Sequence, residues 1–162
     1  MEKLISDEEY YSNLPKKHIG VTVLIFDKSG KLLLVNPTYK DEWTMPGGGV
    51  DIDETPKIAA LREAKEETGL DLKDIALICV EYTYKEGIKP ETLQFAFYGG
   101  ELNTDEVNNI VLDKNEHSEF KFVEISEAEL LLGKRHRCML PFCIKAINNK
   151  NTEYIEFKDL NA

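Results

Sequence analysis

The segment at residues 46–70, PGGGVDIDETPKIAALREAKEETGL, constrains the fold of this chain more than any other part of the sequence. Its three successive glycines can take backbone angles that are closed to other residues, and they let a ligand approach the main chain. A helix is expected to follow over residues 55–68, with Thr55 or Asp53 as its N-cap and Gly69 as its C-terminal stop. The sequence therefore places a glycine-rich turn directly before a capped helix.

One face of this predicted helix is acidic. Glu63, Glu66 and Glu67 have the i, i+3 and i+4 spacing that brings side chains together on a helix. Like charges at this spacing destabilise a helix by about 0.2–0.5 kcal/mol per pair. The opposite side gathers Ile58, Leu61 and Thr68. Ala59 and Ala60 flank the acidic face and are expected to leave room for something to approach it. Taken alone, the pattern is typical of an amphipathic helix with a solvated acidic face, but the glycines ahead of it favour a binding site.

The rest of the sequence predicts a mixed α and β fold in which strands outnumber helices. Strands are expected at residues 18–26, 31–36, 74–86, 92–102 and 119–125. One helix is expected to start at Ser126, where Glu129 would complete a capping box, and another is expected over residues 139–149. Residues 103–118 are expected to form a loop, and residues 152–160 a final strand or tail.

Length and charge indicate one soluble globular domain at residues 1–162, with residues 1–17 as an N-terminal arm. The chain is 42% apolar and 31% charged, which is typical of a globular protein. Its formal net charge is −10 and no basic stripe is visible, which argues against binding to duplex nucleic acid. A phosphate compound would therefore need a divalent cation to attract it to this acidic chain.

The cysteines and the apolar runs bear on where the protein resides. Cys79, Cys138 and Cys143 form no CxxC pair, which indicates reduced thiols in a cytoplasmic protein. The N-terminus is acidic and has no apolar core, so a signal peptide is not expected. The apolar runs are far shorter than the roughly 18 residues that span a bilayer, so no membrane partner is expected.

Residues 48–70, GGVDIDETPKIAALREAKEETGL, resemble the Nudix box, G-x5-E-x7-R-E-U-x-E-E-x-G-U, in which U is an apolar residue. Every fixed position is filled, and only Ala64, where a larger aliphatic residue is commoner, is a mild variant. The resemblance implies the α/β class and the Nudix fold, an α/β/α sandwich around a central mixed β-sheet. It also implies a Nudix pyrophosphohydrolase that uses magnesium, or manganese in its place. Such an enzyme cleaves a pyrophosphate bond in a nucleoside diphosphate linked to another group, by means of metal-activated water.

The resemblance also assigns roles to single residues. The implied metal ligands are Glu63, Glu66, Glu67 and the main-chain carbonyl of Gly47. Arg62 matches the arginine that orients Glu63, and Glu54 matches the glutamate that pairs with that arginine. The general base is Glu63 itself or, as in several Nudix enzymes, a residue outside the box. Glu116 is the first candidate there and Glu119 the second, with a solvated loop glutamate as the alternative interpretation.

Residues that bind the substrate are harder to predict. The candidates are Gly48, Trp43, Tyr84, Phe97 and Arg137. The aromatic side chains could stack on a base or sugar, and packing in the core is the alternative interpretation. Arg137 belongs to a basic run at residues 133–140 that could hold a substrate phosphate or simply start a solvated helix. His117, next to Glu116, is expected to be an ordinary exposed histidine.

The substrate class stays open between nucleoside triphosphates and nucleotide sugars. None of the markers of the ADP-ribose, dinucleoside polyphosphate or coenzyme A subfamilies fits this sequence. The expected partner is a small nucleotide-like molecule, bound by a monomer or homodimer. The alternative function is a Nudix-fold nucleotide sensor without turnover, although such proteins usually have broken boxes and this box retains every carboxylate.

Overall fold

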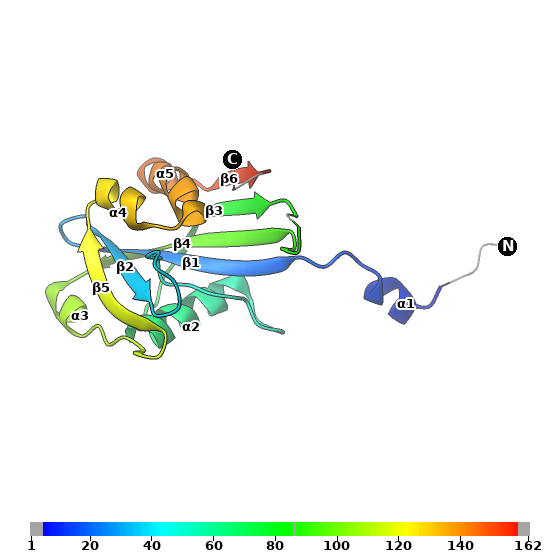
Figure 1. The fold of residues 1–162 in the computed structure, drawn as a ribbon, viewed down its shortest axis with the longest axis horizontal. Coiled ribbons are helices and arrows are strands. Elements are labelled where there is room, and N and C mark those ends of the chain that lie inside the picture. Colours follow the sequence, from blue (N-terminus) through cyan, green and yellow to red (C-terminus); the bar gives the residue numbers. More distant parts are fainter. Residues whose placement is uncertain (1–4, 86, 159–162) are drawn as a thin grey trace.

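The structure is a computed structural model that describes residues 5–85 and 87–158 (Figure 1). Parts of three predictions lie outside the described residues. They are positions 1–4 of the N-terminal arm, position 86 at the end of the strand predicted at 74–86, and positions 159–160 of the final segment.

A six-stranded mixed sheet forms the centre of the fold, with the strand order β5-β2-β1-β4-β3-β6. Its strands are β1 (His18–Asp27), β2 (Leu32–Pro37), β3 (Ala76–Thr83), β4 (Thr92–Leu102), β5 (His117–Val123) and β6 (Glu153–Phe157). The helices are α1 (Asp7–Ser12), α2 (Pro56–Thr68), α3 (Thr104–Asn108), α4 (Ile125–Leu131) and α5 (Lys134–Asn149). β1 pairs in parallel with β4 and antiparallel with β2, which confirms the prediction of a mixed sheet.

Helices cover both faces of this sheet, with α2 on one face and α4 and α5 on the other (Figure 1). Successive residues of a strand point to opposite faces, so β1 supplies side chains to two cores. Val23 packs in the cluster under α2, whereas Leu24 packs in the cluster under α5. This double burial explains why β1 is apolar along most of its length, and the layers confirm the predicted α/β/α sandwich.

Three helices differ from the sequence predictions. Residues 103–118 are not all loop, because Asn103 and Glu106 form a capping box that starts the short helix α3. The capping box predicted at Ser126 is wrong, since α4 begins one residue earlier and its N-cap, Glu124, makes no side-chain capping bond. The helix predicted at 139–149 begins at Lys134 instead, because the basic run forms its first turns.

The sheet fills the room that the sequence predicts beside the alanines of α2. Ala59, Ala60 and Ala64 are fully buried in the core cluster. The alanines therefore pack against the sheet and not against a ligand. Ile58, in contrast, is 56% exposed. Small side chains let α2 lie close to the sheet, and this close packing turns one member of the acidic face, Glu67, toward the interior.

Candidate active site

Arg62 organises the acidic face of α2. Its Nε and Nη2 atoms donate to the two carboxylate oxygens of Glu54, each at 3.0 Å. Its Nη1 atom donates to Glu63 at 2.8 Å and to Glu66 at 3.0 Å. Hydrogen bonds to Arg62 lower the pKa of Glu54. One guanidinium therefore offsets much of the repulsion among these carboxylates.

The glycine turn lies directly against two of the glutamates. The main-chain N–H of Gly47 donates to Glu67 Oε2 at 2.9 Å. An added Cβ at Gly48 would lie 2.5 Å from Glu63 Oε1, so this glycine makes room for the carboxylate. The carbonyls of Pro46 and Gly48 accept hydrogen bonds from β1, which fixes the turn to the central strand. The turn and the helix therefore form one rigid frame around the acidic residues.

Glu67 is the most deeply buried carboxylate of this frame, with 5% of the residue exposed. Burial raises the pKa of Glu67 to about 8, and the charges of Glu63 and Glu116 also raise it. Burial likewise raises the pKa of Glu63, against the effect of Arg62. A buried carboxylate is costly unless a proton or a cation compensates its charge.

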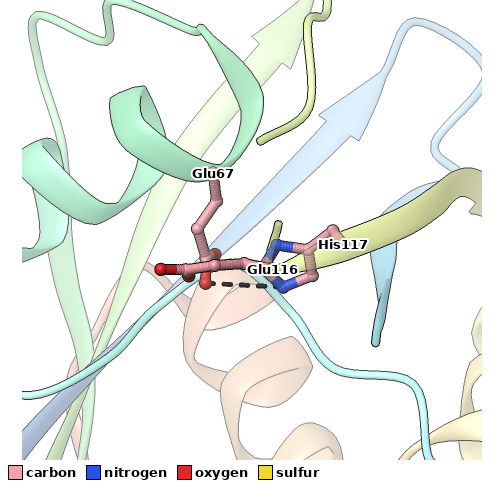
Figure 2. A group of neighbouring side chains, drawn as sticks. All are labelled: Glu67, Glu116 and His117. Carbon is pink, nitrogen blue, oxygen red and sulfur yellow. Dashed lines mark ion pairs between the residues drawn. The ribbon is translucent and has the colours of Figure 1, made fainter. Parts of the chain in front are cut away.

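Glu116, in the turn before β5, and His117, the first residue of β5, complete the group. Glu67, Glu116 and His117 each offer a ligand atom, and these atoms all lie within 4.8 Å of one another. Figure 2 shows the three side chains converging, with the His117 ring turned toward Glu67. Nε2 of His117 lies 3.5 Å from Glu67 Oε1. His117 is 1% exposed, so the prediction of an ordinary exposed histidine is wrong.

Glu119, the second candidate for the base, does not join this group. It belongs to β5 opposite Asn36, and its carboxylate accepts a 3.4 Å hydrogen bond from that residue. Glu116, in contrast, is exposed and faces Glu67. Of the two loop candidates, the structure therefore brings only Glu116 to the acidic group.

The loop after β2 borders the acidic group, and sequence reasoning missed it. Burial raises the pKa of the Tyr39 hydroxyl, and the charges of Glu67, Glu116 and Glu63 raise it further. The charge of Lys40 offsets a small part of the rise in the pKa of Glu67. An open cavity of about 630 Å³ is lined by residues 36–41 and Ser118. An exposed Tyr-Lys pair after a strand carries no distinctive sequence signal, and only strand pairing brings it to β5.

Four of the five substrate candidates lie apart from the acidic group. Trp43 and Phe97 are buried in the two opposite cores. The hydroxyl of Tyr84 donates to Glu156 at 2.8 Å beside the edge strand β6. Arg137 is exposed on α5. Of the candidates, only Gly48 contacts a box glutamate, so the substrate-binding role of the other four remains a prediction without a supporting contact.

Two members of the basic run in α5 make contacts in the interior. Arg135 Nε donates to Glu81 Oε1 at 2.8 Å, and Glu81 on β3 is fully buried. Thr44 Oγ1 and His136 Nδ1 lie 3.0 Å apart. Burial lowers the pKa of His136 to about 4, so this ring is neutral at pH 7. These two residues of the run therefore join the helix to the sheet rather than forming an open phosphate site.

Comparison with known proteins agrees with the fold and the site. The family profile described as "NUDIX domain" matches residues 16–143. An RNA pyrophosphohydrolase from Zymomonas mobilis is 32% identical over 120 residues, which cover 65% of this chain and 77% of that protein. Several other RNA pyrophosphohydrolases match over 59 residues only, about 36% of this chain and a similar share of theirs.

Solved structures show the same architecture. The MutT protein from Methanosarcina mazei Go1 is 26% identical with a TM-score of 0.64, over 84% of this chain and 96% of that one. An Ap4A hydrolase from C. elegans is 23% identical with a TM-score of 0.66, over 82% of this chain and 98% of that one. The second similarity concerns the fold alone.

The fold and the acidic frame define a hydrolase of the Nudix class. The chain belongs to the Nudix family and is a Nudix pyrophosphohydrolase. Among the described residues, none of the helices has the length and apolar character that a bilayer crossing requires.

Proposed function

We propose that this protein hydrolyses a pyrophosphate bond in a nucleoside diphosphate linked to another group, with the help of a divalent cation. The observation that supports this most is the convergence of buried and exposed carboxylates on Glu67, whose pKa is raised to about 8. Burial raises the pKa of this carboxylate, and the negative charges of Glu63 and Glu116 raise it further. A cation bound there would compensate these negative charges.

The donor set fits magnesium or manganese. Both are hard ions that take oxygen ligands, and the candidates here are carboxylate oxygens. The residues proposed to hold the ion are Glu63, Glu66, Glu67 and the main-chain carbonyl of Gly47. When bound, such an ion lowers the pKa of a bound water and neutralises charge on phosphate oxygens.

The side chains around these ligands have separate tasks in this proposal. Arg62 holds Glu63 and Glu66 in place, and Glu54 holds Arg62 through two parallel hydrogen bonds. Glu116 is our candidate for the group that accepts the proton of the attacking water. It is exposed and it faces Glu67.

The substrate is proposed to be a nucleoside with a 5′-polyphosphate, which is the chemistry shared by free nucleoside triphosphates and the 5′ end of an RNA. The relative from Zymomonas mobilis favours RNA. The net charge of −10 favours a small nucleotide, because a longer phosphate backbone would be repelled. Nucleotide sugars remain a further candidate from the box resemblance.

The test is phosphate, pyrophosphate or nucleoside monophosphate release from a panel of these compounds, measured with and without magnesium. The panel includes nucleoside triphosphates, nucleotide sugars and a short 5′-triphosphorylated RNA. Glu67→Gln is the control that should abolish magnesium-dependent release. Tight nucleotide binding without release from any compound would instead favour a sensor, and release that does not depend on the metal would contradict the proposed ligand set.

A further inference from the structure

His117 differs from its neighbours at the proposed metal site because it is a histidine among carboxylates. It stands at the start of β5, opposite Pro37 and beyond a register shift in the β2–β5 pairing. Such irregularities re-aim side chains. Here the side chain is 2% exposed and its Nε2 atom faces Glu67.

The two ring nitrogens have different surroundings. Nδ1 is buried, and it has no hydrogen-bond partner among residues 5–85 and 87–158. A proton on Nδ1 would therefore bury an N–H group without an acceptor, which costs about 1–3 kcal/mol. Buried N–H groups without a partner are also rarer than underused acceptors. The arrangement favours the ring proton on Nε2, where it points to a carboxylate oxygen.

This assignment also distinguishes a metal ligand from a supporting residue. A metal-binding histidine coordinates through a lone pair and almost always donates its other N–H to a carboxylate, carbonyl or water. His117 has no such acceptor for Nδ1–H among the described residues. We propose that His117 is a positioning residue, which presents Nε2–H to Glu67 and orients this metal-binding carboxylate without binding the metal itself. The inference rests on the proposed function.

The consequence is that Glu67 has a donor facing each of its oxygens. The Gly47 N–H donates to Oε2 at 2.9 Å, and His117 faces Oε1 at 3.5 Å. A carboxylate has about four lone-pair sites, so both oxygens can still face a cation. Loss of the His117 contact frees Oε1, and loss of such a supporting contact typically weakens metal binding by about 10–100-fold.

The test uses the full chain and Mn²⁺ alone as the probe. His117→Phe keeps a planar ring but removes the donor, whereas His117→Gln places an amide N–H at a similar reach. His18→Phe, at an exposed histidine that starts β1, is the matched control. We measure the Mn²⁺ dissociation constant of each variant by EPR titration, and the ¹⁴N coupling of bound Mn²⁺ in the wild type by electron spin echo spectroscopy.

We expect His117→Phe to bind Mn²⁺ about 10–100-fold more weakly, His117→Gln and His18→Phe to stay near wild type, and the spectrum to lack a coordinated nitrogen. A nitrogen ligand in the wild-type spectrum overturns the inference, as does unchanged binding by His117→Phe. If His117→Phe does not fold, two readouts test the inference. They are the absence of a nitrogen ligand in the wild-type spectrum and the near-wild-type Mn²⁺ affinity of His117→Gln. A wild type that binds no Mn²⁺ would instead refute the proposed function, and this inference with it.

Discussion

Among single residues, Glu67 combines burial, negative neighbours and a main-chain hydrogen bond, and this combination has a measurable cost. Its pKa is raised from an ordinary 4.5 to about 8, chiefly by burial. A carboxyl with a higher pKa in the folded protein binds more protons when folded. Its contribution to stability is therefore complete below pH 4.5, and it is lost as the pH rises through about 8.

The first prediction follows for the metal-free protein. The free energy of unfolding should fall between pH 5 and 8 by up to roughly several kcal/mol, and Glu67→Gln should remove most of this fall because an amide does not titrate there. Magnesium should restore stability in the wild type only. Denaturant unfolding at a series of pH values measures this. An identical pH dependence in both proteins would show that Glu67 is not the titrating group.

Arg62 gives the second prediction at this scale. Lysine has one compact ammonium group and cannot span Glu54, Glu63 and Glu66 as the guanidinium does. Arg62→Lys should lower kcat by about 10–100-fold, as for other residues that support metal ligands, with little change in thermal stability. Lys57→Arg, at an exposed position of α2, is the matched control. If Arg62→Lys turns over substrate as fast as the wild type, Arg62 does not orient the glutamates.

At the scale of elements, the glycine turn and α2 act as a unit. Gly47 has φ 152°, and an added Cβ would collide with the Val21 carbonyl oxygen and Thr22 Cα. Gly49 has no atom within 4 Å of an added Cβ and no such φ. A side chain is therefore expected to fit at Gly49 but not at Gly47.

We predict that Gly47→Ala destabilises the protein by at least about 1–3 kcal/mol and weakens metal-dependent turnover, because the turn must move away from Glu67. Gly49→Ala should change either quantity little. Thermal unfolding and kcat/KM for both variants provide the comparison. Equal thermal stability and equal kcat/KM in the two variants would contradict the proposed coupling between the turn and the helix.

Elements with explicit end signals were predictable from sequence. α2 begins after the Thr55 cap and ends at Gly69 with φ 74°, within a residue of expectation. α3 and the true start of α4 were missed, because a five-residue helix shows no periodicity and Ser126 offers a capping pattern that the fold does not use. The burial of Ala59, Ala60 and Ala64 against the sheet was missed, because alanines give a weak apolar signal.

At the scale of the whole molecule, α5 is tied to the sheet by a buried ion pair. Arg135 contacts Glu81, which is fully buried. Arg135→Met should destabilise the protein by about 3 kcal/mol, the lower end for a broken buried pair because Arg135 keeps some solvent contact. Arg137→Met, on the exposed side of α5, is the control and should be near neutral. Equal stability of the two variants in denaturant would contradict this account.

The assembled site exceeds what the sequence could reveal. Glu63, Glu66 and Glu67 could be predicted from the box, because their grouping depends only on their spacing within one helix. Glu116 could be proposed only from the family resemblance, and His117 was judged exposed, because the pairing of β5 with β2 decides where both residues lie. Register depends on contacts across the whole sheet, and one sequence does not display them.

The most direct measurement is a crystal structure of the protein soaked in excess Mn²⁺ with a non-hydrolysable nucleotide analogue, using the anomalous signal of the metal. We expect at least one ion between the carboxylate of Glu67 and the phosphates of the analogue. A bound analogue with only water beside Glu63, Glu66 and Glu67 would contradict the proposed metal site.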